Sequence, residues 1–240
     1  MAQDQVVAVY KPEGLTPLEA LTRFRDIYPV YRKEKLSYAG RLDPLAEGVM
    51  PVLVGEAVKR PEESRGWDKE YLVEILFGAS TDTGDVMGLA EEVALPGRIL
   101  EADLSRVAIS LFGTRSQTAP KFSSPGLSGK NFKREVTIFE LTFKGVRRLA
   151  VREFVDRTAD RLARVSGDFR QTEILTRWFK YLPGRGEFQV ASFLVSCSAG
   201  TYLRVLGPEI GRELGKPALV YTIQRTRVGP YVRQDCFEIA

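Results

Sequence analysis

The position of Asp43 raises the first question about chemistry. It lies among apolar residues in the stretch SYAGRLDPLAEGV (37–49), directly before Pro44. One interpretation is structural, because an aspartate followed by a proline is typical of the start of a short turn. The other is catalytic, because a carboxylate held against Leu42 and Leu45 is a candidate nucleophile. This stretch alone favours the turn, and other parts of the chain change that balance.

The amino-acid composition narrows the possible reactions. The chain has no histidine, which removes the commonest general base, the commonest metal ligand and every Ser-His or Cys-His pair. Its two cysteines are too few for a disulfide framework or a zinc site, and no Cys-x-x-Cys occurs. Any chemistry must therefore rest on carboxylates, tyrosine, lysine or arginine. We expect neither a metal ion nor a cofactor.

Three residues far from Asp43 are candidates to work with it. Tyr71 begins an alternating apolar stretch directly after WDKE, and Ile223 lies in a late strand-like stretch. For both, packing in a core is the ordinary role. Arg204 stands in the first turn of a predicted helix between two apolar residues, where a guanidinium requires a carboxylate partner.

Length and composition predict one soluble domain spanning 1–240. A chain of 240 residues with 44% hydrophobic and 28% charged residues can bury one good core. Its first residues include an early acid and no basic region, so no signal peptide is predicted. No apolar run approaches the roughly 20 residues that a membrane-spanning helix needs. We therefore expect a cytoplasmic protein without a membrane partner, acting as a monomer.

Positive charge is concentrated in one part of the chain. The net charge is +4, yet residues 144–185 contain 11 Lys/Arg against 5 Asp/Glu, an excess of 6 positive charges. Aromatic residues are interleaved with these arginines, a pattern that suits a phosphate-rich partner such as RNA. Arg157, Arg161 and Arg164 are the candidate phosphate contacts. The alternative is a helical face whose charges are merely solvated.

The order of elements predicts an α+β fold. Strands and helices follow one another without regular βαβ alternation, which favours a mixed, largely antiparallel sheet flanked by helices. The basic segment 146–183 is predicted to form two helices broken near Ser166–Gly167. The remaining predicted strands are 5–12, 48–55, 69–78, 134–145, 187–200 and 218–231, and the remaining predicted helices are 16–29, 98–113 and 201–215.

Five segments, in this order, resemble the TruB family of tRNA pseudouridine synthases. They are VYKPEGLTPLEAL, GRLDPLAEGVMPVLVGEAVKR, KEYLVEILFGASTDTGD, CSAGTYLRVLGPEIGRELG and VYTIQRTRVGPY, which cover most of 6–88 and 187–232. The resemblance implies a pseudouridine synthase fold with a central catalytic cleft. It also implies an isomerase that detaches uracil from ribose and rejoins it through carbon, with RNA as its partner.

The resemblance assigns roles to the candidate residues. Asp43 matches the nucleophile, and Arg204 matches the arginine that pairs with it. Tyr71 matches the residue that stacks on the everted base and serves in proton transfer, and Ile223 matches an apolar residue that packs on the uracil. Lys11 belongs to the early Lys-Pro motif that supports the cleft, and we count it among the substrate-binding residues. A uridine in folded RNA must leave its stack to reach them, at a cost of a few kcal/mol.

The substrate-binding stretch departs from the family pattern. The family has a Gly-His-x-Gly-x-Leu-Asp stretch, whereas this chain reads SYAGRLD, with Tyr38 in place of the histidine and Arg41 in place of a small residue. We expect Tyr38, Gly40, Arg41 and Leu42 to contact the substrate. Tyr38 can stack or wedge, but it cannot make the histidine's hydrogen bonds, so the mode of base extrusion is expected to differ.

The RNA-gripping parts of the family also differ here. The stretch 118–143 lacks about a dozen residues of the family's corresponding region. A basic segment, 146–183, is inserted before CSAGTYLR. The chain stops at Ala240, and we expect no C-terminal RNA-binding domain. The prediction is a single synthase domain whose grip on RNA has moved to the basic helical insertion.

Three functions remain open from the sequence. The leading one is a synthase acting on uridine in the T loop of tRNA. The second is an RNA-binding or tRNA-folding protein that keeps the cleft but modifies nothing, which the tyrosine at position 38 motivates. The third is a synthase that acts on another RNA. Retention of Asp43, Tyr71 and Arg204 together favours catalysis, because binding alone requires none of them.

Overall fold

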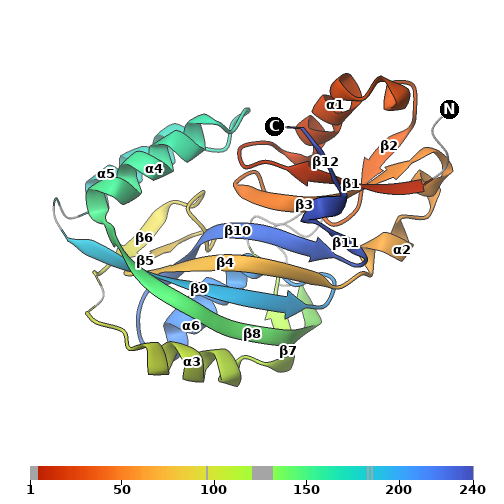
Figure 1. Ribbon diagram of the computed structural model, residues 1–240. Coiled ribbons are helices and arrows are strands. Elements are labelled where there is room, and N and C mark those ends of the chain that lie inside the picture. The colour runs from red at the N-terminus through yellow and green to blue at the C-terminus, as the bar shows by residue number, and fades with distance from the viewer. Residues whose placement is uncertain (1–4, 96, 121–131, 183, 185, 240) are drawn as a thin grey trace.

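The computed structural model describes residues 5–95, 97–120, 132–182, 184 and 186–239. Within them, one large mixed sheet runs through the molecule in the order β12-β1-β3-β10-β4-β9-β8-β7, with β2 and β11 at its side (Figure 1). Two pairings are parallel, β1 with β12 and β3 with β10, and the others are antiparallel. The predicted α+β class with a largely antiparallel sheet is therefore confirmed. The strands of this sheet are β1 (Gln5–Lys11), β2 (Leu36–Tyr38), β3 (Ala46–Val54), β4 (Lys69–Phe77), β7 (Gly113–Thr118), β8 (Lys133–Ala150), β9 (Glu187–Cys197), β10 (Ala218–Val228), β11 (Tyr231–Val232) and β12 (Cys236–Glu238).

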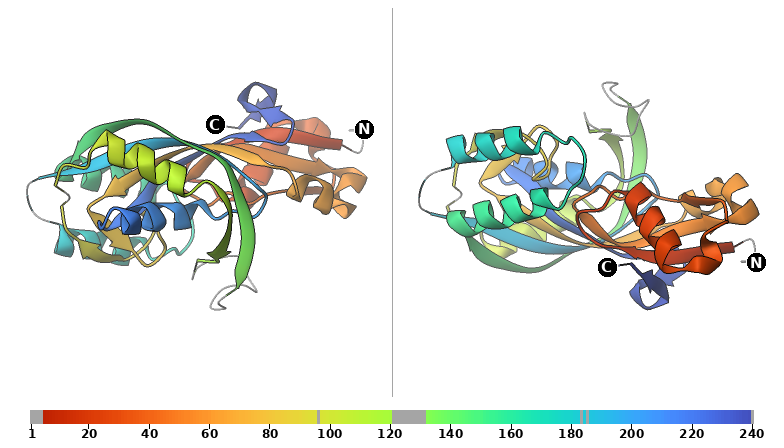
Figure 2. Two further views of the ribbon diagram at one scale, coloured as in Figure 1. Left: turned by 90° about the horizontal axis from the view of Figure 1, so that it is seen from below. Right: turned by 90° about the horizontal axis from the view of Figure 1, so that it is seen from above.

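Helices cover both faces of this sheet. Seen from below, α3 and α6 lie against one face; seen from above, α1, α4 and α5 lie against the other (Figure 2). Helices α3 and α6 enclose one apolar core with the sheet, α4 and α5 a second, and α1 a third. No helix in the described part of the chain is long and apolar enough to cross a membrane. The helices are α1 (Pro17–Ile27), α2 (Pro61–Arg65), α3 (Glu101–Ser110), α4 (Val151–Ala163), α5 (Gln171–Tyr181) and α6 (Leu203–Glu213), with 3-10 turns η1 (Pro29–Tyr31), η2 (Gly55–Lys59) and η3 (Arg233–Asp235) and a separate hairpin of β5 (Ala79–Thr81) and β6 (Ala90–Val93).

Local signals place the start of α1. The hydroxyl of Thr16 accepts a hydrogen bond from the backbone N–H of Glu19 (3.3 Å), and the Glu19 carboxylate accepts one from the N–H of Thr16 (2.7 Å). This capping box satisfies two N–H groups that the first helical turn leaves unpaired. Pro17 takes the first helical position, where its missing N–H costs nothing.

The basic segment begins later as a helix than the sequence predicts. Residues 146–150 continue β8, because they pair with β9 from Val146 opposite Ala191 to Ala150 opposite Glu187. The two predicted helices then follow as α4 and α5, and the chain between them contains the expected break at Ser166–Gly167. We call residues 151–182 the arm. Residue 183, the predicted end of the insertion, lies outside the described residues.

Two strand pairings bring the distant motifs together. On one side of β10, Ile223 is opposite Ala46 of β3, just after the Asp43 turn. On its other side, Arg225 is opposite Tyr71 of β4. Because alternate residues of a strand share a face, Ile223 and Arg225 point the same way, between the Asp43 turn and Tyr71.

Candidate active site

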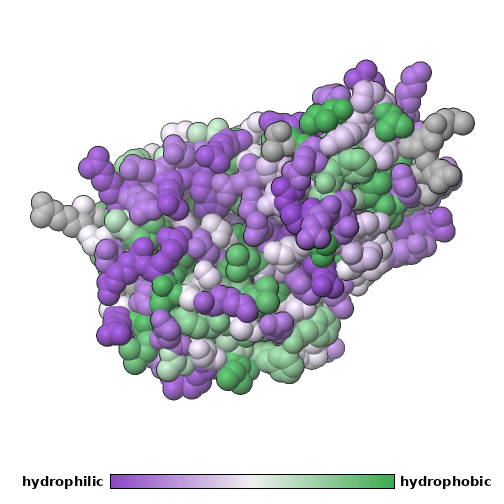
Figure 3. Space-filling model, in the orientation of Figure 1, coloured by the Kyte–Doolittle hydropathy of each residue, from purple (hydrophilic) through white to green (hydrophobic). Residues whose placement is uncertain are grey.

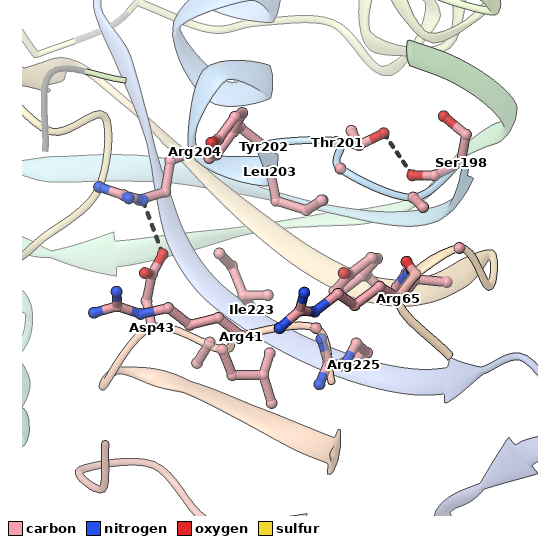
Figure 4. Close-up of a pocket in the computed structure, with 18 of the residues that line it drawn as sticks. Arg41, Asp43, Arg65, Ser198, Thr201, Tyr202, Leu203, Arg204, Ile223 and Arg225 are labelled. Carbon is pink, nitrogen blue, oxygen red and sulfur yellow. Dashed lines mark hydrogen bonds and ion pairs between the residues drawn. The ribbon is translucent and has the colours of Figure 1, made fainter. Parts of the chain in front are cut away.

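Asp43 and Arg204 meet although 161 positions separate them in the chain. Asp43 opens a tight turn in which its carbonyl accepts a hydrogen bond from Ala46 N–H (3.0 Å). Arg204 extends from the first turn of α6, and its Nε lies 2.8 Å from Oδ2 of Asp43 (Figure 4). The Arg204 side chain is 9% exposed and that of Asp43 is 33% exposed. Asp43 therefore shapes its turn through its backbone carbonyl, while its carboxylate meets both the guanidinium and solvent.

A second carboxylate, Asp85, reaches the same guanidinium. Its Oδ2 lies 3.9 Å from Nε of Arg204. The Thr83 hydroxyl (2.6 Å) and the backbone N–H of Met87 (3.0 Å) donate to its Oδ1. Burial raises the pKa of Asp85, and Arg204 opposes that rise. Sequence reasoning did not assign Asp85 to the site.

The charge of Arg204 is held by these two partners. Burial alone would lower its pKa, but the carboxylates of Asp43 and Asp85 outweigh that effect, and the net pKa is raised. Arg204 is thus a fixed cation between two acids.

An open cavity of about 760 Å³ lies beside the ion pair. Eight of the predicted site residues line it: Tyr38, Gly40, Arg41, Leu42, Asp43, Tyr71, Arg204 and Ile223. Figure 4 shows the Asp43–Arg204 pair, Ile223, Arg41, Arg65 and Arg225 gathered around this space. A cavity of this size is within the range of small-molecule sites and can take a nucleoside.

Tyr71 and Arg225 form a buried pair at the base of the cavity. Burial raises the pKa of Tyr71 to about 12, against an opposing hydrogen bond and charge from Arg225. The phenol is therefore neutral at physiological pH. Arg225 is 1% exposed; its Nε donates to the carbonyl of Val49 (2.7 Å). Sequence reasoning did not assign Arg225 to the site, although its place two residues after Ile223 in a strand is a signal that the two share a face.

Lys11 supports the site from behind, and the described lining of the cavity does not include it. Its buried Nζ donates to the carbonyls of Pro12 (3.0 Å), Leu15 (2.6 Å) and Pro44 (3.2 Å). The last of these bonds holds the residue that follows Asp43. We expected this lysine among the substrate-binding residues, and the structure shows it bonded to the turn of Asp43.

The buried Lys11 makes stability depend on pH. Burial lowers its pKa from 10.5 to about 7, so between these values the unfolded chain holds a proton that the folded chain lacks. The free energy of unfolding therefore rises with pH in this window, by on the order of 1 kcal/mol per pH unit at most. Urea unfolding from pH 7 to 9.5 should give a flatter curve for Lys11→Met than for the wild type. Parallel curves would show that Lys11 does not cause the dependence.

Arg161, predicted to contact RNA phosphate, is buried, and its guanidinium is already bound to other groups of the protein. Its Nη2 lies 2.8 Å from the Glu13 carboxylate, its Nη1 donates to the carbonyl of Tyr221 (2.8 Å), and its guanidinium lies over the Tyr221 ring. This prediction is wrong, because the inner face of α4 turns Arg161 toward the sheet, and counting charges along the sequence cannot reveal that.

The other two predicted arginines of α4 lie at the surface. Arg157 is exposed and pairs with Glu153 one turn earlier (2.7 Å), and Arg164 is exposed after the end of the helix. In Figure 3 the region of α4 and α5 is largely hydrophilic, whereas the lower edge, over β8 and α3, carries more apolar side chains. The outer face of the arm is thus the polar one.

No group of three or more His, Cys, Asp or Glu side chains that could hold a metal ion occurs among the described residues. The chemistry that this geometry offers is that of a carboxylate, a fixed guanidinium and a neutral phenol around an open cavity.

Comparisons with known proteins agree with this arrangement. The model of the TruB family pseudouridylate synthase (N terminal domain) matches residues 28–151. A tRNA pseudouridine synthase B of Bacillus cereus (strain ATCC 10987 / NRS 248) is 30% identical over 232 residues, covering 96% of this chain and 68% of that protein. One of Syntrophomonas wolfei subsp. wolfei (strain DSM 2245B / Goettingen) is 31% identical over 231 residues, covering 96% and 67%.

A solved structure shows the same fold. The crystal structure of a Cbf5-Nop10-Gar1 complex contains a chain that superposes with a TM-score of 0.64 at 21% identity, covering 97% of this chain and 51% of that chain. This protein thus spans about two thirds of the length of the curated relatives and about half of that of the solved chain. The match over residues 28–151, together with these relatives, shows that the chain belongs to the TruB family of pseudouridylate synthases.

Proposed function

We propose that this protein isomerises uridine to pseudouridine in RNA, with Asp43 as the nucleophile and uridine in the T loop of tRNA as the first target. The observation that carries the proposal is the 2.8 Å ion pair of Asp43 and Arg204 at the wall of an open cavity that Tyr71 also lines. The relatives named tRNA pseudouridine synthase B supply the choice of tRNA.

The cavity accounts for binding of an everted base. Leaving the stack costs a uridine a few kcal/mol. Stacking on the ring of Tyr71 returns about 1–3 kcal/mol, the range for bases on aromatic side chains. Ile223, on the neighbouring strand, supplies an apolar contact to the same base. Tyr38 also lines the cavity, and we assign it a contact with the entering nucleotide.

The reaction needs one bond broken and one formed at the ribose. The bond between uracil N1 and C1′ breaks, C5 bonds to C1′, the proton on C5 leaves, and N1 gains a proton. The Asp43 carboxylate attacks C1′ as the bond to N1 breaks and the uracil leaves with the electron pair; C5 of the turned uracil then bonds to C1′ and displaces the carboxylate. The Arg204 guanidinium stabilises the carboxylate's negative charge before the attack and again after this release. The neutral Tyr71 phenol is placed to relay the C5 proton.

Cations in and near the cavity suit the RNA backbone. Arg41, Arg65 and Arg134 line the cavity, and the exposed Arg157 and Arg164 lie on the arm. We assign phosphate contacts to these five residues, which makes binding strongly salt-dependent. We also propose that the protein acts in the cytoplasm as a monomer.

Release of tritium from RNA labelled at uracil C5 tests the activity. The purified protein should release tritium from a tRNA transcript, and mapping should place pseudouridine in the T loop. RNA binding without release from tRNA or total RNA would instead identify a non-catalytic RNA-binding protein. Release from ribosomal RNA but not from tRNA would identify a synthase with another target.

A further inference from the structure

The arm touches the site's supporting loops at two points. The first is Arg161, whose Nε (2.9 Å) and Nη2 (2.8 Å) both reach Oε2 of Glu13. This pair is largely buried, with 9% of the arginine side chain and 20% of the glutamate side chain exposed. Glu13 lies in the loop that follows β1, directly after Lys11 and Pro12.

That loop holds the turn of Asp43. The N–H of Gly14 donates to the carbonyl of Pro44 (2.9 Å), and Nζ of Lys11 donates to the same carbonyl (3.2 Å). The arm packs closely on this loop, because a Cβ at Gly14 would lie 2.8 Å from Cβ of Arg164. Displacement of the arm would therefore reach the peptide next to Asp43 through one loop.

The second contact is made by Arg170, at the start of α5. Its Nη1 donates to Oδ2 of Asp82 (2.9 Å) and its Nη2 to Oδ1 (3.4 Å). Oδ1 of Asp82 also accepts the backbone N–H of Leu89 (2.7 Å) and so closes the loop 82–89. Asp85, the second carboxylate at Arg204, lies in that loop.

The backbone conformation of Arg170 supports the importance of its contact with Asp82. Arg170 has a φ of +64°, in the left-handed region, the only non-glycine with positive φ among the described residues. An L side chain is unfavourable there and glycine is preferred, so a long arginine is retained at a conformational cost. The contacts of the side chain offset that cost. The contact with Asp82 is bidentate.

We propose that Arg161 and Arg170 are positioning residues, which make the arm a brace for two loops: the loop that holds the turn of Asp43 and the loop that contains Asp85. The proposal rests on the proposed function for its catalytic readout. The apolar side of the arm, where Phe154 packs against Trp178 and Phe188, fixes it on the sheet. The two ion pairs then transmit that fixed position to the two carboxylates beside Arg204, those of Asp43 and Asp85.

Substitution of Arg170 tests the brace through the rate. Arg170→Gln should lower kcat by about 10-fold, with KM and RNA affinity within about twofold of wild type. The loss is limited because the loop keeps another bond, from the N–H of Val220 to the carbonyl of Gly84 (2.8 Å). Asp82→Asn should do the same, and the double variant should be no slower than either single one. Arg152→Gln, at an exposed position of α4, is the matched control and should keep the wild-type rate.

Two further measurements separate positioning from folding and from activity. Arg170→Gly removes the side chain but relieves the left-handed backbone, so its Tm should not fall while its kcat does. Amide hydrogen exchange in loop 82–89 should be faster in Arg170→Gln than in Arg152→Gln, a readout that needs no activity. Wild-type exchange in the loop, or a wild-type kcat in Arg170→Gln, would overturn the brace. Absence of tritium release by the wild type would refute the proposed function and leave the exchange result to decide on the brace.

Discussion

Asp43→Asn should reduce tritium release from labelled tRNA by at least about 10⁴-fold, the scale on which enzymes lose turnover with their nucleophile. The amide is a poor nucleophile, and it carries no charge to oppose Arg204. The side chain keeps its size, and the carbonyl of residue 43 still accepts the N–H of Ala46 that forms the turn. The folded structure and the affinity for RNA should therefore stay close to wild type.

The control for this experiment is Glu47→Gln. Glu47 is a partly buried acid on β3 that accepts a hydrogen bond from Gln224 (3.0 Å) and is absent from the described lining of the cavity. Glu47→Gln removes the same charge as Asp43→Asn, but at a position outside the cavity lining. Its turnover should therefore stay close to wild type. Turnover that survives Asp43→Asn would remove Asp43 from the mechanism, whatever the control shows.

Arg204→Gln should have the second largest effect, in both turnover and stability. It leaves the carboxylates of Asp43 and Asp85 facing each other without their shared cation. Breaking a buried pair costs about 3–5 kcal/mol, and the partial exposure of Asp43 points to the lower end, about 3 kcal/mol. Turnover should fall by about 10²–10³-fold, as when a fixed charge-stabilising group is lost.

The pH dependence identifies the cause of that loss. Without Arg204, the pKa of Asp85, already raised by burial, rises further. A carboxyl whose pKa is raised by folding lowers the free energy of unfolding as pH rises from its ordinary pKa to the raised one. The stability difference from wild type should therefore shrink toward about pH 4, the ordinary range of an aspartate. Arg212→Gln, at an exposed site on the same helix, should leave both stability and turnover unchanged. A difference that stayed constant with pH would point to lost packing instead of lost charge.

Much of the site could be predicted because its motifs are short and local. The stretch LDPLAEG contains the turn of Asp43, and the stretch CSAGTYLR places Arg204 at the start of a helix. The resemblance implied that the two side chains meet, and the ion pair is present. Thr16 and Glu19 likewise predict the start of α1 from four consecutive residues.

Asp85 and Arg225 could not be assigned in the same way. An acidic loop of the TDTGD type has the composition of an ordinary turn, and nothing local shows that Arg204 will lie 3.9 Å away. Arg225 stands in an apolar strand, where the side chain it faces depends on the register between β4 and β10. Both roles follow from contacts between elements far apart in the chain.

The basic arm shows most clearly which features the sequence determines and which depend on the tertiary structure. The sequence by itself determined the two helices, the break between them and the excess of arginine. Only the tertiary structure decided that Arg161 turns inward to Glu13 and that Arg170 reaches Asp82, while Arg157 stays at the surface. The physical reason is that helical periodicity depends on neighbours along the chain. The partner of a charged side chain depends on which face of the helix packs on the sheet, and that is settled only when the whole core forms.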